Sequence, residues 1–294
     1  MNMPLRLDGA ARRQVTREVA GYPIRATYHG ECAQPRATWL FVHGMVESDD
    51  VWASVPPLLP PGVVAVTLEL PWSGRLDALW GLSMAPEQWL HAALEAHGIA
   101  PDGIVAHSFG ANVVLQYLER HGSGGVAHLL LISPFYKAST GDVSWELFQH
   151  YVFEFERFIE LSLTVRQGSR PLAPELFGAV RQKLRDQFGC YSWMQFWQLF
   201  SRTPFLSLRE FTQPCLLITG ADDFSSPLAD VTALARGLPD ARLVVFEDCS
   251  HFCLSSKRQE TLAQIVDFVD MSLPAPFSTS PTHRSTHDAR SSHT

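Results

Sequence analysis

The chain has 294 residues, of which 46% are hydrophobic and 18% are charged, and its formal net charge is −7 at pH 7. This length and composition favour one large globular unit with an insertion over two independent domains. The negative balance, together with the lack of any long run of Lys and Arg in the sequence, argues against nucleic acid as a partner.

The sequence has no stretch that approaches the roughly 18 uninterrupted apolar residues of a membrane-spanning helix. Residues 1–8, MNMPLRLD, lack the basic-then-apolar layout of a secretory signal. The five cysteines are odd in number and scattered, which is not typical of a disulfide framework. We therefore expect a cytoplasmic protein with reduced thiols and no insertion into a membrane.

Short apolar or β-branched runs alternate with helical segments along the chain. These runs are residues 24–28, 38–42, 63–68, 103–106, 129–132, 215–219 and 243–246. Several are apolar throughout, such as LLI at 216–218, which is typical of parallel strands covered by helices on both faces. The pattern predicts an α/β fold with a mostly parallel central β-sheet flanked by helices, and functional groups at the carboxyl ends of the strands.

The stretch 137–208 differs from the rest because it has no clear strand and is dense in Phe, Tyr and Trp. Pro171 and Pro174 divide it into two helical blocks, and Pro204 marks the return to the sheet. We predict a helical cap or lid inserted between a first part of the core, residues 1–136, and a second part, residues 209–273. Residues 274–294 offer little to bury, so they are predicted to form a disordered tail.

Aromatic residues recur at helical spacing near the end of this insertion. Trp193, Phe196, Trp197 and Phe200 would lie on one helix face. Two interpretations remain open: this face forms the internal core of the insertion, or part of it lines a substrate site. Trp193 and Trp197 are therefore candidate substrate-binding residues.

Ser108 lies in the segment AHSFG at 106–110, directly after one apolar run and directly before a helix-like stretch. A serine between small residues at a strand-to-helix turn is held in a strained backbone conformation that exposes its hydroxyl at the start of a helix. The context predicts a nucleophile. An isolated Ser-x-Gly would more often be a structural turn, so the prediction depends on partners elsewhere in the chain.

A serine nucleophile requires a histidine base, and that histidine requires a carboxylate to orient it. Suitable residues follow two later runs. The segment GADD at 220–223 offers Asp222 and Asp223, and the segment EDCSHF at 247–252 offers His251. Serine, acid and histidine therefore occur in this chain order, each just beyond a predicted strand.

This order resembles the α/β-hydrolase fold family, in which the triad runs nucleophile, acid, histidine. The resemblance spans roughly residues 24–272 and includes HGM at 43–45 and LPWSGR at 70–75, which are similar to two loops of the family. It implies Asp223 as the acid, three residues after the glycine that ends its strand, with Asp222 as the fallback. It also implies an oxyanion hole formed by the backbone N–H groups of Met45 and Phe109.

The sequence departs from the family at two positions. Ala106 stands in place of the first glycine of the serine motif, a mild change because alanine is small. Trp72 occupies a position where the family often has glycine. Its indole either faces the substrate pocket or covers the sheet, and we include it among the candidate substrate-binding residues.

Other candidate residues have plainer interpretations. His107 and His43 are predicted to be packing or hydrogen-bonding residues, and Arg75 a surface ion-pair residue with a carboxylate such as Asp77. Cys249 and Cys253 flank His251 at alternate positions, but no fourth ligand lies nearby, so we predict no metal site.

The resemblance implies a serine hydrolase that cleaves an ester or thioester of a largely apolar small molecule through an acyl-enzyme, without a cofactor. The acyl group is free or is carried by CoA or a carrier protein. The segment 249–254 also has a short similarity to the histidine region of stand-alone thioesterases that serve polyketide or peptide synthases. Alternatives on the same scaffold are hydrolysis of carbon–carbon, lactone or amide bonds, acyl transfer, and a non-catalytic binding protein or receptor.

Overall fold

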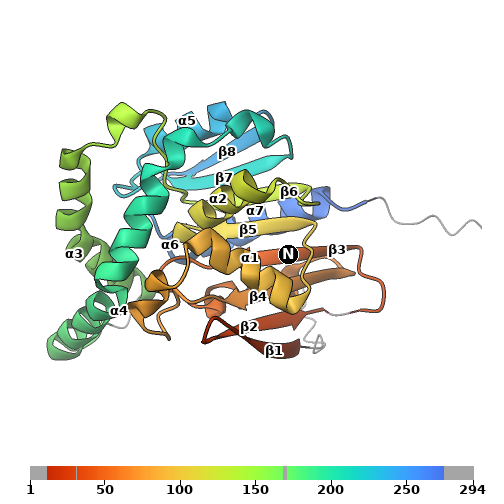
Figure 1. Ribbon diagram of the computed structural model, residues 1–294, viewed down its shortest axis with the longest axis horizontal. Coiled ribbons are helices and arrows are strands. Elements are labelled where there is room, and N and C mark those ends of the chain that lie inside the picture. The colour runs from red at the N-terminus through yellow and green to blue at the C-terminus, as the bar shows by residue number, and fades with distance from the viewer. Residues whose placement is uncertain (1–11, 31, 168–170, 275–294) are drawn as a thin grey trace, which may run out of the picture.

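The computed structural model describes residues 12–30, 32–167 and 171–274. Its centre is an eight-stranded sheet with the order β1-β2-β4-β3-β5-β6-β7-β8 (Figure 1). The strands are β1 (Arg12–Val19), β2 (Tyr22–His29), β3 (Ala37–Val42), β4 (Val63–Glu69), β5 (Gly103–His107), β6 (His128–Ile132), β7 (Cys215–Gly220) and β8 (Ala241–Phe246). β1 and β2 run antiparallel to their neighbours, and all pairs from β4 to β8 are parallel, as the sequence predicts.

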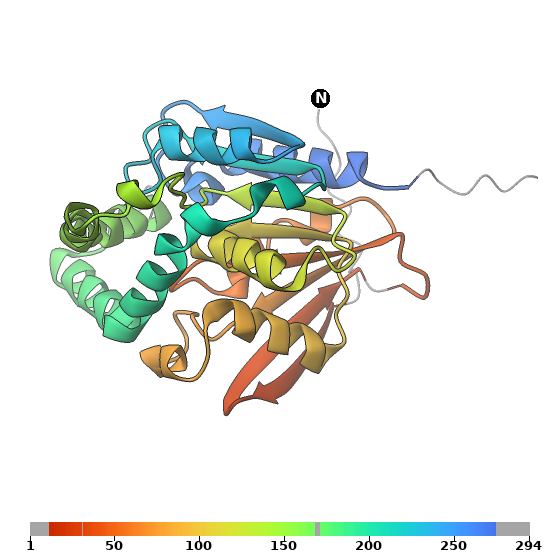
Figure 2. The ribbon, with the colours of Figure 1, turned by 45° about the horizontal axis from the view of Figure 1, so that its top comes forward.

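Helices cover both faces of the sheet. They are α1 (Pro86–His97), α2 (Phe109–His121), α3 (Trp145–Gln167), α4 (Pro174–Ser201), α5 (Leu228–Gly237), α6 (Cys253–Ser256) and α7 (Arg258–Met271). Apolar residues of α1, α2 and α5 belong to one buried cluster, and those of α6 and α7 belong to a second. Figure 2 shows α1 and α2 side by side on the near face of the sheet.

Successive side chains of the central strands point to opposite faces of the sheet, and they form these two clusters. On β3, Leu40 and Val42 join the cluster under α1 and α2, whereas Trp39 and Phe41 join the cluster under α7. These side chains are at most 1% exposed, because helices cover both faces of the strand. The sheet is therefore a rigid platform for the loops at its carboxyl edge.

The aromatic stretch forms the long helices α3 and α4, which lie together at one side of the sheet (Figure 1). Pro174 is the first residue of α4, a position at which proline leaves no helical hydrogen bond unmade. Gly189 interrupts α4 with a left-handed φ of 59° that favours glycine, so Trp193 and Phe200 lie beyond a kink. The residues 137–208 are thus helical, apart from short turns, over the part that the structure describes.

Strand β1 was not predicted from the sequence. Its side chains are exposed or half-buried along its whole length, so it shows no apolar alternation, and it is held by antiparallel pairing with β2. The predicted tail over 274–294 lies outside the described residues except for Pro274. No helix in the described ranges combines the length and apolarity needed to cross a membrane.

Candidate active site

Ser108 lies at the turn between β5 and α2. Its backbone has φ 54° and ψ −125°, the strained conformation expected for a serine at such a turn. The turn is tight, because a Cβ placed on Gly110 would lie 2.4 Å from the carbonyl oxygen of His43. Glycine at 110 therefore lets the helix start close against the loop that follows β3.

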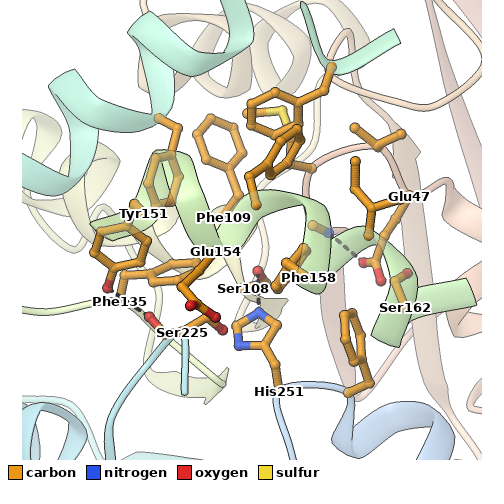
Figure 3. Close-up of a pocket in the computed structure, with 18 of the residues that line it drawn as sticks. Glu47, Ser108, Phe109, Phe135, Tyr151, Glu154, Phe158, Ser162, Ser225 and His251 are labelled. Atoms are coloured by element: carbon orange, nitrogen blue, oxygen red, sulfur yellow. Dashed lines mark hydrogen bonds between the residues drawn. The ribbon is translucent and has the colours of Figure 1, made fainter. Parts of the chain in front are cut away.

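His251 and Asp223 meet Ser108 from the loops after β8 and β7. Ser108 Oγ lies 2.8 Å from His251 Nε2, and His251 Nδ1 lies 2.8 Å from Asp223 Oδ2. A carboxylate accepts from Nδ1–H, which leaves the Nε2 lone pair directed at the serine hydroxyl. The structure thus brings together three residues that are far apart in the sequence, and Figure 3 shows the Ser108 and His251 side chains facing each other.

The carboxylate of Asp223 is held by a local cage of donors. Its Oδ1 accepts from the Ser225 and Ser226 backbone N–H groups at 3.0 and 2.8 Å and from the Ser225 hydroxyl at 2.8 Å. Burial raises the pKa of Asp223, but the charge of His251 and these hydrogen bonds outweigh it and hold the pKa below its ordinary value. Asp222, the fallback acid, is exposed and makes no contact of this kind.

The loop after β3 begins with His43, which the structure buries completely. Its Nε2 accepts from the Leu70 N–H at 3.0 Å, so Nδ1 carries the proton and donates to the Gly44 carbonyl at 2.8 Å. Burial lowers the pKa of His43, although the bond to Gly44 opposes this, and the ring is neutral. Met45 follows on the same loop, and Met45 and Phe109 both line the cavity beside Ser108.

Trp72 does not line the cavity beside Ser108, which contradicts the expectation from the sequence that it contributes to a substrate site. Its side chain is 1% exposed and packs on Trp80 and Phe109. Its indole N–H donates to the His43 carbonyl at 3.1 Å. Trp72 therefore covers the sheet and fixes the start of the loop that carries Met45.

A cavity adjoins Ser108, and its space together with the open solvent at its mouth amounts to about 940 Å³. Most of its wall is apolar and comes from both the sheet loops and the two long helices. Figure 3 shows Ser108 and His251 with Phe135, Tyr151 and Phe158 around them. The apolar part of the wall includes Met45, Phe109, Phe135, Phe155, Phe158, Ile159, Phe188, Trp193, Phe196 and Phe252.

The two tryptophans of α4 have different positions. Trp193 lines the cavity and contacts the rings of Phe155 and Phe188. Trp197 does not line it and packs on Phe148 and Phe200 instead, because the helix turns that side chain away from the cavity. Of these two candidate substrate-binding residues, Trp193 therefore lies at the cavity wall and Trp197 does not.

The ion-pair partners of Arg75 differ from the partner suggested by the sequence, Asp77. Arg75 is an ion-pair residue, but its partners are Asp49, Asp50 and Glu69. Asp77 instead accepts from the Tyr22 hydroxyl and from a backbone N–H.

The cysteines near the histidine are free thiols, and Cys249 Sγ lies 3.3 Å from Cys253 Sγ. Within the ranges that the structure describes, no group of three or more His, Cys, Asp or Glu side chains is arranged to hold a metal ion.

Several residues that support the site were not singled out from the sequence. The Asn112 side chain donates to the Phe135 carbonyl at 2.7 Å and accepts from its N–H at 2.9 Å, which fixes Phe135 at the cavity wall. Ser133, with a left-handed φ of 48°, donates from its hydroxyl to the His251 carbonyl at 3.0 Å. Their sequence signal is weak, because each acts through a contact with a distant loop.

Comparison with known proteins identifies relatives of the whole core. The profile described as "Alpha/beta hydrolase family" matches residues 39–265. A protein of Aromatoleum aromaticum, pimeloyl-(acyl-carrier protein) methyl ester esterase, is 30% identical over 254 residues, which cover 80% of this chain and 98% of that protein.

Solved structures share the same fold at low identity. An esterase from Exiguobacterium antarcticum matches with a TM-score of 0.60 at 14% identity, over 84% of this chain and 96% of that one. A haloalkane dehalogenase variant from Bradyrhizobium elkanii matches with a TM-score of 0.61 at 16% identity, over 89% and 97%. At these identities the likeness concerns the fold alone. The profile match and the curated relative show that the chain belongs to the alpha/beta hydrolase family, as a hydrolase.

Proposed function

We propose that the protein is a serine esterase that cleaves acyl esters through an acyl-enzyme on Ser108. The observation that carries the proposal is the chain of two 2.8 Å contacts from Ser108 through His251 to Asp223, at the wall of an apolar cavity. A nucleophile, a base and a group that orients the base are the three parts that this chemistry needs.

In the first half-reaction, His251 Nε2 takes the Ser108 hydroxyl proton while Oγ attacks the ester carbonyl carbon. The backbone N–H groups of Met45 and Phe109 would hold the oxyanion that forms. His251 then gives its proton to the departing alcohol, and the carbon–oxygen bond to that alcohol breaks. Asp223 keeps the imidazole oriented and stabilises its charged form throughout.

In the second half-reaction, water replaces the alcohol. His251 takes a proton from water, the hydroxyl attacks the acyl carbon, and the bond to Ser108 Oγ breaks as His251 returns the proton to it. The products are a carboxylic acid and free enzyme. The rings of Phe135 and Phe158 lie 5.2 Å from the His251 ring, centroid to centroid, and exclude bulk water from the relay.

The apolar wall favours a substrate with an alkyl or aromatic acyl part. The Aromatoleum relative is named for a methyl ester of an acyl chain linked to a carrier protein. We propose the same class here: a neutral acyl ester or thioester, free or attached to CoA or a carrier, with residues 137–208 serving as a cap over it.

A panel of p-nitrophenyl esters and acyl thioesters of graded chain length tests this function. We expect turnover that rises with chain length until the cavity is filled and that disappears in Ser108→Ala. Ser255→Ala, which removes an exposed hydroxyl on α6, is the matched control and should keep full activity. A well-folded wild-type protein that turns over no ester or thioester would contradict the proposal and favour a binding protein or another hydrolysed bond.

A further inference from the structure

Glu47 and His107 form a buried pair beside Ser108 that the proposed mechanism does not use. Glu47 Oε2 accepts from the Gly44 backbone N–H at 2.8 Å and lies 2.9 Å from His107 Nδ1. The Glu47 and His107 residues are 8% and 2% exposed, respectively. One carboxylate oxygen therefore connects the loop after β3 to the residue that immediately precedes the nucleophile.

The loop segment 44–47 is folded tightly around this oxygen. The Glu47 N–H donates to the Gly44 carbonyl at 3.3 Å, and Val46 between them has a left-handed φ of 58°. A Cβ on Gly44 would lie 2.9 Å from Glu47 Oε2 and 3.3 Å from His107 Nδ1. Glycine at 44 thus permits the close approach, and Met45 lies inside the turn that Glu47 closes.

The second ring nitrogen of His107, Nε2, makes no hydrogen bond among the described residues, so the role of the imidazole depends on the contact of Nδ1 with Glu47. This second nitrogen is also buried. Burying an unpaired polar atom is unfavourable, and a phenylalanine ring would fill the same space without this penalty. The contribution that only histidine makes here is the Nδ1–H bond to Glu47, since a carboxylate only accepts and the imidazole must donate from Nδ1.

We propose that Glu47 and His107 are positioning residues that hold the Met45 N–H at the correct distance from Ser108 to bind the oxyanion. This inference rests on the proposed function. Oxyanion donors work over a range of distances only about 0.4 Å wide, and a displacement of about 1 Å lowers the rate roughly a hundredfold. A link between the two loops that carry the donor and the nucleophile fixes this distance before substrate binds.

Two variants of Glu47 separate positioning from packing. Glu47→Gln keeps a carbonyl oxygen that accepts from both Gly44 and His107, whereas Glu47→Met keeps a similar volume and removes the acceptor. For p-nitrophenyl ester hydrolysis we expect Glu47→Met to lower kcat about 10- to 100-fold with KM within about threefold of wild type. Glu47→Gln should restore kcat to within about threefold of wild type.

An inhibitor that mimics the tetrahedral state supplies a readout that a merely structural role would not move. A trifluoromethyl ketone adds the serine oxygen to its carbonyl carbon and places an oxyanion in the hole. Its inhibition constant should rise in Glu47→Met by the same factor by which kcat/KM falls. The KM for the neutral ester should change by less than about threefold, because the ground state does not use the hole fully.

The outcomes separate this inference from the function on which it rests. Wild-type protein without Ser108-dependent turnover would overturn both. Active wild type with unchanged kcat in Glu47→Met would overturn the inference alone, and so would equal losses in Glu47→Gln and Glu47→Met accompanied by equal drops in melting temperature. If Glu47→Met does not fold, His107→Phe tests the inference by the same two readouts, kcat and the inhibition constant of the trifluoromethyl ketone. This variant keeps an aromatic ring and removes the Nδ1–H donor.

Discussion

Replacing Trp72 by phenylalanine tests whether this residue supports the site or binds substrate. The substitution keeps an aromatic ring but removes the indole N–H, which donates to the His43 carbonyl at 3.1 Å. It also leaves space between Trp80 and Phe109, which both contact the indole at ring distances below 6 Å. The cavity beside Ser108 should keep its walls, because Trp72 does not line it.

The magnitude follows from two terms. The buried His43 carbonyl loses a donor, which is unfavourable by about 1–3 kcal/mol. The smaller ring forfeits apolar contacts in a site that is 1% exposed, and shrinking large core side chains adds to the loss. Together we expect a free energy of unfolding lower by about 2–4 kcal/mol, which for a chain of this size corresponds to a melting temperature lower by roughly 3–7 °C.

The assay pairs Trp72→Phe with Trp193→Phe. Thermal unfolding and the chain-length profile of ester hydrolysis are measured for both, with Trp197→Phe as a control outside the cavity wall. Trp72→Phe should lower stability and leave the preferred chain length unchanged. Trp193→Phe should shift the preference toward longer or bulkier acyl groups, since each buried methylene contributes about 0.8 kcal/mol. A shifted profile in Trp72→Phe with unchanged stability would refute the reasoning.

Three further outcomes follow from the site. Gly110→Ala should destabilise the protein by about 1–3 kcal/mol and lower activity, because its Cβ would collide with the His43 carbonyl; urea unfolding that matches wild type would contradict this tight turn. Asp223→Asn should lower kcat about 10³- to 10⁴-fold, while Asp222→Asn leaves kcat unchanged. A large loss of kcat in Asp222→Asn and none in Asp223→Asn would show that Asp223 is not the acid. Burial lowers the pKa of His43, so below about pH 6.5 this histidine binds a proton in the unfolded chain but not in the folded protein. The free energy of unfolding therefore falls as the pH falls, by at most about 1.4 kcal/mol per pH unit. Between pH 7.5 and 5.5, His43→Gln should lose less stability than wild type in urea unfolding, and equal losses would contradict a neutral buried ring.

The sequence predicted the sheet and the order of the site residues because both leave local signals. Runs such as 215–219 are apolar throughout, and Ser108, Asp223 and His251 each follow such a run directly. Parallel strands bring their carboxyl ends to one edge, so residues just beyond them converge. The sequence of β1 contains no such apolar run. This exposed edge strand is held by backbone pairing with β2, and its mostly polar side chains show no alternation of apolar and polar residues.

Contacts between loops could not be predicted from the sequence. Trp72 follows β4 on a loop whose direction is set by packing against Trp80 and Phe109, and no local pattern tells an inward indole from one that faces a cavity. Glu47 and His107 are 60 positions apart and meet only because β3 and β5 are neighbours in the sheet. Trp193 and Trp197 share a helical spacing, yet only one reaches the cavity.

Labelling with a fluorophosphonate, followed by peptide mass mapping, tests most directly that Ser108 is the nucleophile. The probe phosphonylates an activated serine and releases fluoride, so only a hydroxyl served by a base reacts quickly. We predict one labelled peptide that contains Ser108, slower labelling in Asp223→Asn, and none in Ser108→Ala. Labelling at another serine, or unchanged labelling after Ser108→Ala, would contradict the account.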